Sequence, residues 1–224
     1  MRQTPAVEFT LAVAMCPPER LIGLARTAEA AGWDAVAVPD SVFYPEEVSG
    51  SYPFSGDGAR FWAPDTPFVD PLVAIPAMAA ATERIGFVTN VLKTPLRHPL
   101  LVAMFPGRIT LGVGLSWMPE EFAWLGQEMA TRGRRLDEQI EVIRALLAGG
   151  WVEHHGRHYD FDRLRMEPAP GPGVPIVVGG HSPPAMARAA RLGDGWIGAQ
   201  ADRDTLATLL TDVHAALDAA GRDP

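Results

Sequence analysis

The stretch Pro175-Ile-Val-Val-Gly-Gly-His-Ser-Pro-Pro184 decides how this chain folds. An apolar strand ends at two glycines, and a helix begins at once, with Ser182 as its N-cap and Pro183 at its first position. Such a junction turns backbone N–H groups and the positive end of a helix dipole toward whatever lies above the strand. The stretch therefore predicts a strand and a helix with an anion site between them, and phosphate is the commonest anion at such sites.

A second junction of the same kind lies upstream. Ile109-Thr-Leu-Gly-Val-Gly114 runs into Leu115-Ser-Trp-Met-Pro-Glu120, so glycines again stand at the carboxyl end of a strand. Glycines in this position can serve merely to let the chain turn. Two such ends in one chain favour a shared ligand, and we expect both junctions to contribute to one site.

The composition predicts one α/β domain over residues 1–224. The chain is 47% hydrophobic and carries a formal net charge of -8, without a run of basic residues. Such a chain is poorly suited to binding nucleic acid. Cys16 is the only cysteine, and we find neither a signal peptide nor an apolar stretch of membrane-spanning length. We expect a cytoplasmic protein that binds small molecules and neither nucleic acid nor membranes.

Strand-like apolar segments alternate with helix-like amphipathic ones. The expected strands are Val7–Ala14, Ala35–Val38, Ile85–Leu92, Ile109–Val113, Ile176–Val178 and Trp196–Gly198. The expected helices are Glu19–Ala31, Asp70–Thr82, Arg134–Leu147, Ala185–Leu192 and a last helix capped by Asp202, with Leu206, Leu210, Val213 and Leu217 on its inner side. This alternation predicts parallel strands with right-handed crossovers, and ligand sites at the carboxyl ends of the strands.

Two architectures fit this order, an open doubly wound sheet and a closed β/α barrel. The dinucleotide fingerprint fails, because Gly112-Val-Gly114 is followed by Trp117 where a third glycine would stand. We therefore expect a TIM (β/α)8-type barrel. Residues 93–108 leave room for only a short helix after strand three, and the chain accommodates about six βα units. The expected barrel is incomplete, without strands seven and eight and without part of the helix after strand three.

Several segments carry a family resemblance. They are Gly32-Trp-Asp-Ala-Val-Ala-Val-Pro-Asp40, Asp65-Thr-Pro-Phe-Val-Asp-Pro-Leu72, Ala80-Ala-Thr-Glu-Arg-Ile85, Arg97-His-Pro-Leu-Leu101, Gly107-Arg-Ile-Thr-Leu-Gly-Val-Gly114, His155-Gly-Arg-His-Tyr-Asp-Phe-Asp162 and Arg191-Leu-Gly-Asp-Gly-Trp196. In this order they resemble the luciferase-like monooxygenase superfamily, and its F420-dependent oxidoreductase branch most closely. The resemblance covers nearly the whole chain and implies a TIM barrel that holds the deazaflavin coenzyme F420, or a flavin, and passes hydride to or from an organic substrate.

The resemblance also implies where the cofactor lies. Its phosphate would rest on the two glycine junctions, and its ring against the ends of strands two and three. The end of strand three would be bulged, with a non-proline cis peptide between Asn90 and Val91. The implied cofactor-binding residues are Asp40, Thr89, Asn90, Val91, Gly114, Leu115, Ser116, Gly179, Gly180, His181 and Ser182.

Two residues depart from the family pattern. Ser41 stands where relatives often have a histidine that transfers a proton, and serine is a poor acid and base at neutral pH. The catalytic residue is therefore not identified from the sequence. Trp117 stands where sugar-phosphate dehydrogenases of this branch have an acidic residue, which argues against that class of substrate.

The long segment of residues 41–68 follows strand two and is rich in Pro, Gly and aromatic residues. Loops of this length are often lids or binding loops, and some are simply surface. One hypothesis is a substrate lid with aromatic walls from Phe43, Tyr44, Phe61 and Trp62, and a plain surface loop is the alternative.

Two other patterns point away from metal and hydrolase chemistry. We interpret His154-His155-Gly-Arg-His158 as a polar crossover loop, because its spacing matches no common zinc pattern, and we expect no metal site. Ser116 lacks the glycine surroundings of a nucleophile elbow.

The favoured function is F420-dependent hydride transfer to or from a small organic substrate. The alternatives are an FMN-dependent luciferase-like monooxygenase and an inactive or cofactor-binding remnant. Relatives commonly form dimers through barrel helices, which leaves a homodimer open here.

Overall fold

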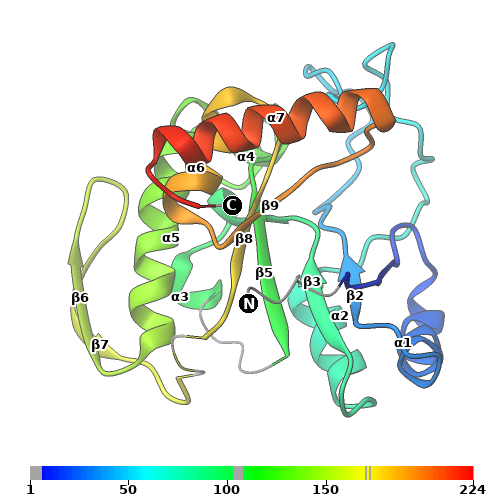
Figure 1. Ribbon diagram of the computed structural model, residues 1–224, viewed down its shortest axis with the longest axis horizontal. Coiled ribbons are helices and arrows are strands. Elements are labelled where there is room, and N and C mark those ends of the chain that lie inside the picture. Colours follow the sequence, from blue (N-terminus) through cyan, green and yellow to red (C-terminus); the bar gives the residue numbers. More distant parts are fainter. Residues whose placement is uncertain (1–6, 103–107, 170, 172, 224) are drawn as a thin grey trace.

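The computed structural model describes residues 7–102, 108–169, 171 and 173–223. Its main sheet is parallel, and the strands follow one another in chain order (Figure 1). They are β1 (Thr10–Ala12), β2 (Ala35–Val38), β3 (Gly86–Thr89), β5 (Ile109–Gly114), β8 (Ile176–Gly179) and β9 (Gly195–Ile197), with the short β4 (Leu92–Lys93) also paired to β5. The sheet curls into a half-barrel, so the predicted incomplete β/α barrel is confirmed.

Helices connect these strands and cover one face of the sheet. The longer ones are α1 (Leu21–Ala30), α2 (Pro71–Ala79), α5 (Arg132–Ala148), α6 (Pro183–Leu192) and α7 (Arg203–Ala219). Short turns complete the connections: η1 (Pro18–Arg20), η2 (Thr94–Leu96), α3 (Pro99–Val102), α4 (Pro119–Trp124) and η3 (Met129–Thr131). The predicted N-cap of the last helix is confirmed, because Asp202 accepts a hydrogen bond from the Thr205 N–H at 2.8 Å. Asp70 caps α2 in the same way and accepts one from the Leu72 N–H at 2.8 Å. Within the described residues, no helix is long and apolar enough to cross a bilayer.

The core lies between the sheet and its helices. Val113 and Val178 pack with Ile140 of α5 in one buried cluster, and Val36 packs with α1 and α2 in a second. Side chains alternate along a strand, so the residues between these valines face the hollow of the half-barrel. On β5 and β8 the last residues on that inner side are glycines.

The third predicted strand is interrupted. β3 ends at Thr89, β4 begins at Leu92, and the Asn90–Val91 peptide bond between them is cis. The expected position of the cis bond is confirmed, and the interruption falls where a bulge was expected. The short α3 agrees with the limited room expected after this strand, and residues 103–107 lie outside the described part.

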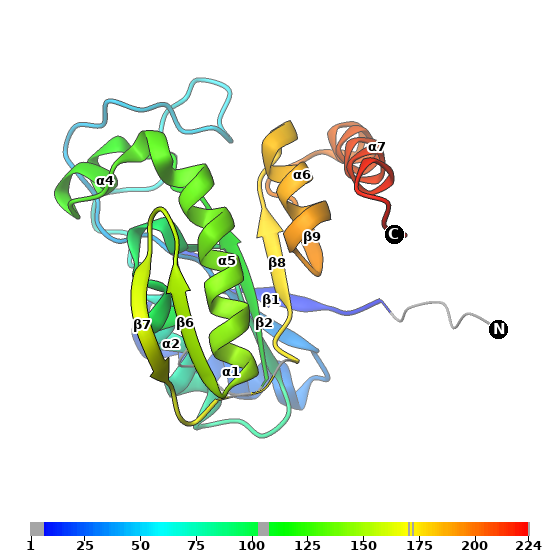
Figure 2. The same ribbon diagram turned by 90° about the vertical axis from the view of Figure 1, so that its left-hand side faces the viewer.

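The structure corrects the interpretation of the histidine-rich segment. Residues 151–165 form an antiparallel hairpin, β6 (Trp151–His155) and β7 (Asp160–Arg165), rather than a polar crossover loop. Its alternating apolar residues Val152, Phe161 and Leu164 pack against the core cluster that includes α5 (Figure 2). The many polar side chains in this segment obscured its apolar positions in the sequence.

The inner face of α7 also differs from expectation. α7 packs on α6 (Figure 2), and Leu209 is its one buried residue. Leu206 and Leu210 are 41% and 43% exposed, so their predicted inward placement is wrong. The apolar side of this helix is wide, and the contact with α6 uses only part of it.

Gly112 gives a test of the sheet geometry. A Cβ atom at Gly112 would overlap the Thr89 carbonyl oxygen of β3 and lie 3.0 Å from Ile197 Cδ1. We expect Gly112→Ala to lower the free energy of unfolding by about 1–3 kcal/mol, because the neighbouring strand must move. Gly23→Ala is the matched control, since nothing lies within 4 Å of that added Cβ on helix α1. The control should gain about 0.5–1 kcal/mol in chemical denaturation, and equal stabilities of the two variants would contradict the described packing.

Candidate functional site at the carboxyl ends of the strands

The two glycine junctions lie side by side. β5 and β8 are paired in parallel with Val113 opposite Val178, so Gly114 and Gly179 follow at neighbouring positions on the same edge of the sheet. The structure therefore brings together the two strand ends that were expected to share a ligand.

Val91 packs over both glycines. A Cβ atom at Gly114 would lie 2.5 Å from Val91 Cγ2, and one at Gly179 would lie 2.8 Å from Val91 Cγ1. Any side chain at either position would have to displace Val91. The glycines thus let the residue after the cis bond sit directly against the ends of β5 and β8.

Backbone donors are available at this edge. Within the described residues, the N–H groups of Leu115, Ser116 and His181 have no hydrogen-bond partner. The Gly180 N–H makes a long contact of 3.4 Å to the Ile197 carbonyl, and Gly180 has a positive φ of 127°. Free N–H groups on two adjacent loops are the feature that an anion needs.

The helix α6 contributes fewer donors than its position suggested. Pro183 and Pro184 have no N–H, and the N–H groups of Ala185 and Met186 both bond to the Ser182 carbonyl. Ser182 stands at the predicted N-cap, but its side chain makes no capping hydrogen bond. The loop before the helix, rather than the helix itself, therefore presents the donors.

His181 is held in one tautomer. Its Nε2 accepts a hydrogen bond of 2.9 Å from the Ala199 N–H, which assigns the ring proton to Nδ1. Burial lowers the pKa of His181, so the imidazole is neutral at pH 7. The side chain can donate one hydrogen bond from Nδ1 beside the β8 end.

A buried charge network ties the strand ends to the loops. Both carboxylate oxygens of Asp40 accept from the Arg97 guanidinium, at 2.7 and 3.0 Å, and one also accepts from the Lys93 N–H at 2.8 Å. Arg97 also bonds Asp70 at 2.7 Å, at the N-cap of α2. Burial alone would lower the pKa of Arg97, but hydrogen bonds and charge from Asp40 and Asp70 raise it.

A second ion pair lies beside the first. Lys93 Nζ is 2.6 Å from Glu121 Oε1, and the Glu121 side chain is fully buried. Glu121 also accepts hydrogen bonds from the Ser116 hydroxyl and, at 3.3 Å, from the Val42 N–H. The Ser116 hydroxyl in turn accepts from the Met118 N–H at 3.1 Å. One carboxylate therefore joins β4, the loop after β5 and the start of the long loop.

The predicted site residues thus fall into two groups. The carboxylate of Asp40 and the hydroxyls of Ser116 and Thr89 are buried and bonded within the protein, the last to the Gly112 carbonyl at 2.7 Å. Asn90 and Ser182 are exposed at the mouth, and His181 is half-buried there.

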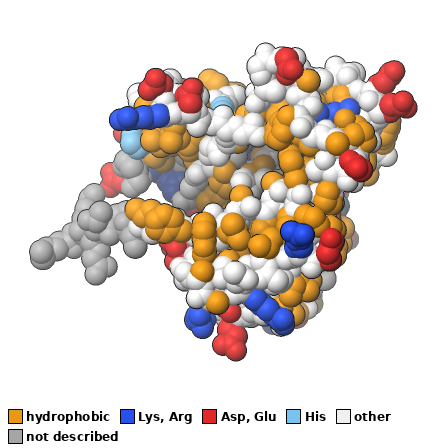
Figure 3. Space-filling view, turned by 90° about the vertical axis from the view of Figure 1, so that its right-hand side faces the viewer, with side chains coloured by type: hydrophobic (Ala, Val, Ile, Leu, Met, Phe, Trp, Pro, Cys, Tyr) orange, Lys and Arg blue, Asp and Glu red, His pale blue; other side chains and the backbone are white. Residues whose placement is uncertain are grey.

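The long loop of residues 41–68 folds over this edge. The ring of Tyr52 lies 5.4 Å from that of Trp117 after β5, and the ring of Phe54 lies 5.2 Å from that of His181 after β8. Phe61 and Trp62 surround Tyr52 at 5.7 and 5.0 Å. Figure 3 shows hydrophobic side chains bordering a hollow on the open face of the molecule. The loop therefore contacts both glycine junctions through aromatic rings.

The other two predicted lid residues lie where the loop is anchored. Phe43 stacks on Trp124 of α4 at 5.0 Å, and Tyr44 lies beneath Arg60 at 3.6 Å. Burial raises the pKa of Tyr52, and a hydrogen bond with the Gln200 side chain opposes that shift.

Sequence reasoning missed Lys93, Arg97, Glu121, Tyr52 and Phe54. Their partners lie far away in sequence, so no local pattern announces them. Of these residues, only Lys93 could have been noticed from the sequence, because it is the one lysine among 19 basic residues.

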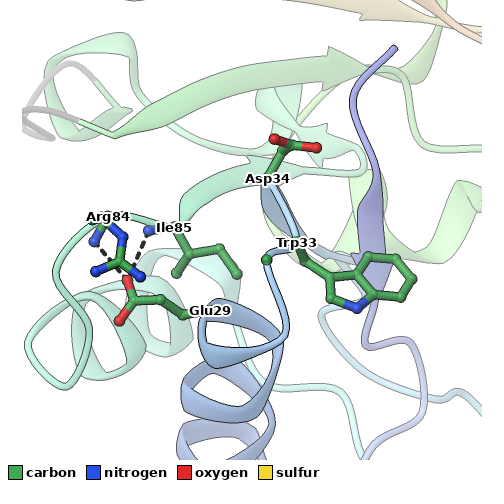
Figure 4. Close-up of a pocket in the computed structure, with 6 residues that line it drawn as sticks. Glu29, Trp33, Asp34, Arg84 and Ile85 are labelled. Atoms are coloured by element: carbon green, nitrogen blue, oxygen red, sulfur yellow. Dashed lines mark hydrogen bonds between the residues drawn. The ribbon is translucent and has the colours of Figure 1, made fainter.

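A cavity lies at the opposite ends of the strands. It measures about 270 Å³ and is lined by Glu29, Trp33, Asp34, Arg84 and Ile85 (Figure 4). The Glu29 carboxylate already accepts hydrogen bonds from the Arg84 and Ile85 N–H groups, at 2.6 and 2.9 Å. Barrel active sites lie at the carboxyl ends, so we assign this cavity a structural role. Among the described residues, no three His, Cys, Asp or Glu side chains are grouped to hold a metal ion.

Removing Arg97 tests the buried network. Arg97→Met leaves the Asp40 carboxylate, whose side chain is 0% exposed, without its counter-charge. We expect a loss of about 3–5 kcal/mol of unfolding free energy in urea titrations. Arg165→Met is the control, because its ion pair with Glu167 is about half exposed on both sides and should change stability by about 1 kcal/mol or less. A loss at Arg97 no larger than at Arg165 would show that the network is not needed.

Comparisons with known proteins agree with this geometry. The family model for luciferase-like monooxygenases matches residues 4–224. An uncharacterized protein of Mycobacterium tuberculosis is 41% identical over 224 residues, covering 96% of this chain and 77% of that protein. An F420-dependent glucose-6-phosphate dehydrogenase of Nakamurella multipartita is 32% identical over 220 residues, covering 92% of this chain and 60% of the relative.

Solved structures show the same fold at low identity. An F420-dependent secondary alcohol dehydrogenase in complex with an F420-acetone adduct has a TM-score of 0.77 at 20% identity, over 99% of this chain and 66% of that one. The monooxygenase RslO1 from Streptomyces bottropensis has a TM-score of 0.76 at 24% identity, over 97% of this chain and 68% of that one. The family match over almost the whole chain, together with these relatives, shows that the chain belongs to the luciferase-like monooxygenase family of oxidoreductases.

Proposed function

We propose that this chain binds coenzyme F420 at the carboxyl ends of β5 and β8 and supports hydride transfer between that cofactor and a small organic substrate. The observation that carries the proposal is the pair of adjacent glycine junctions with unpartnered N–H groups. Relatives named as F420-dependent support the choice of cofactor. A flavin is the alternative, since a neighbour of the same fold is described in complex with FMN.

The residues present fit a cofactor with a phosphate and a flat ring. Glycines at 114 and 179 let Val91 lie directly against the two strand ends. The N–H groups of Leu115, Ser116 and His181, which have no partner among the described residues, suit a phosphate. The neutral His181 adds a donor at Nδ1 without a positive charge. The ring would lie on the inner side of the half-barrel, near Val91.

The bound cofactor would supply the hydride chemistry. The chain's own residues would bind the phosphate, hold the ring against Val91 and exclude water. The Asp40–Arg97–Asp70 network would act indirectly, by fixing the strand ends that form the proposed phosphate site. Trp117 and the aromatic loop favour an apolar substrate over a sugar phosphate.

The loop of residues 41–68 would serve as the lid. Its contacts with Trp117 and His181 support that role, because they join it to both junctions. Phe61 and Trp62 would contribute to the aromatic wall of the lid by packing on Tyr52. Phe43 and Tyr44 would anchor the start of the loop.

Cofactor titration tests the proposal. We expect F420 to quench tryptophan fluorescence with saturation, and FMN to bind at least about tenfold more weakly. His181→Ala should weaken F420 binding by about 10- to 100-fold, because it removes a hydrogen bond to a charged group.

His155→Ala is the control, since His155 lies on the exposed hairpin with a side chain 61% exposed. Its affinity should equal that of the wild type. Tight FMN binding without F420 binding would favour the monooxygenase alternative. Absence of binding by either cofactor would indicate a remnant without activity.

Lid variants test the role of the loop. Tyr52→Ala, and separately the double change Phe61→Ala and Trp62→Ala, should speed F420 release in stopped-flow experiments by about tenfold, because each aromatic contact contributes about 0.5–1.5 kcal/mol. Trp151→Ala removes an aromatic ring that is 60% exposed on β6 and serves as the control. Unchanged release and turnover in both lid variants would leave the loop as plain surface.

A further inference from the structure

The charged groups at the carboxyl ends of the strands include a single lysine. Lys93 is the one lysine in the chain, and every other cationic side chain among the 19 basic residues is an arginine. It is also buried, with a side chain 10% exposed, whereas most cationic side chains of the described residues reach the surface. The cationic side chain at this internal position is thus a lysine, although every other Lys or Arg position in the chain is an arginine.

Lysine and arginine differ in a property that matters at such a position. Arginine holds its charge under all ordinary conditions, whereas a lysine ammonium can release a proton and a neutral amine can take one up. An arginine could supply a fixed charge or an ion pair, as Arg97 does a few residues later. A lysine at this place adds the ability to transfer a proton.

The backbone register directs Lys93 toward the proposed cofactor site. Leu92 belongs to the buried cluster on the helix side of the sheet, so the next side chain faces the inner side. Lys93 is paired with Gly114, the glycine at the end of β5 that also faces inward. The ammonium group therefore lies near the end of β5, where it bonds Glu121 of α4.

The groups around Lys93 leave donors free and hold it in place. Nζ bonds Glu121 at 2.6 Å, the Lys93 N–H bonds Asp40 at 2.8 Å, and the Lys93 carbonyl accepts from Arg97 at 3.4 Å. These are the charged groups that face it, from α4, from the end of β2 and from the turn after η2. Lysine has three N–H donors at Nζ, and Glu121 is the partner found for one of them among the described residues.

The same cluster lies next to the position that lacks a proton-transfer group. Glu121 accepts a hydrogen bond from the N–H of Val42, the residue directly after Ser41. Ser41 stands where the family pattern would have a histidine, and serine cannot do that work at neutral pH. The Lys93–Glu121 pair is therefore close in space to the missing group, although it is far away in sequence.

We propose that Lys93 is the proton donor and acceptor of this site, with Glu121 as the positioning residue that holds its ammonium beside the end of β5. The inference rests on the proposed function. In the reduction of a ketone, the carbonyl carbon receives the hydride that the reduced cofactor supplies, the carbonyl π bond breaks, and the oxygen receives the proton that leaves Lys93 Nζ. The neutral amine then regains a proton from water. In alcohol oxidation, the amine takes the hydroxyl proton as the hydride leaves.

A chain with one lysine permits a direct test by NMR. Protein grown with [¹³Cε]lysine gives a single side-chain resonance, which belongs to Lys93. We expect this resonance to shift on addition of F420 and to saturate together with the fluorescence titration. A resonance that does not move while fluorescence shows F420 bound would overturn the role of Lys93 and leave the proposed function intact. Absence of F420 binding would overturn both.

Substitutions separate proton transfer from a structural role. Lys93→Arg keeps the charge and an ion pair with Glu121, and Lys93→Met keeps only the length. With reduced F420 and cyclohexanone as the carbonyl probe, both variants should lose about 100-fold or more in the rate of hydride transfer, which is the usual contribution of a general acid. Both should keep F420 affinity within about threefold, a change below 1 kcal/mol. Arg165→Lys on the exposed hairpin is the control for the exchange of the two residue types.

The pH profile distinguishes the two roles further. The wild-type rate should fall at alkaline pH as the ammonium loses its proton, and Lys93→Arg should lack that fall. Glu121→Gln removes the carboxylate that holds Lys93 Nζ at 2.6 Å and should lower the rate less than Lys93→Met does, as expected of a positioning residue. Wild-type rates and an unchanged profile in Lys93→Arg would show that only the charge is needed and would overturn the inference. Binding of reduced F420 by the wild type without reduction of cyclohexanone would count against the proton-transfer role.

Discussion

Close approach at the inner ends of β5 and β8 is the constraint on which the rest of the site depends. Gly112, Gly114 and Gly179 stand where the curled sheet brings strands and the cis-linked Val91 together, and a side chain at any of them would meet an occupied position. Interiors are packed too closely to absorb such additions without movement. The glycines therefore allow β3, Val91 and the ends of β5 and β8 to approach one another closely at this edge.

Ion pairs fix the positions of the loops relative to that edge of the sheet. The strand ends are only one side of the site, and the long loop after β2 and the short α4 form the other. Asp40, Arg97 and Asp70 join β2 to the start of α2, and Glu121 joins Lys93 to the loops after β2 and β5. Buried ion pairs add little net stability, but removal of one partner is costly, so such pairs specify geometry strongly. Here they act together with the aromatic contacts of the long loop to fix the positions of these loops.

The strand ends offer polar groups to the site, and the long loop and the segment after β5 offer aromatic rings. Free backbone N–H groups and a neutral His181 suit an anionic group, while the rings of Tyr52, Phe54 and Trp117 suit a flat apolar one. The cations near the mouth are engaged by carboxylates, as Arg97 is by Asp40 and Asp70. These surroundings are consistent with the cofactor and the apolar substrate that we propose.

The sequence by itself determined the strand order, the parallel sheet and the glycine junctions, because apolar runs, caps and glycines at strand ends are local signals. The position of the cis bond was implied by the family resemblance alone. Tertiary structure alone decided that the two junctions are neighbours, that β6 and β7 form a hairpin on α5, and that Tyr52 and Phe54 reach the strand ends. It also decided the pairing of Lys93 with Glu121, because an ion pair between residues 28 apart depends on where the folded backbone brings them, and no short-range periodicity encodes that distance.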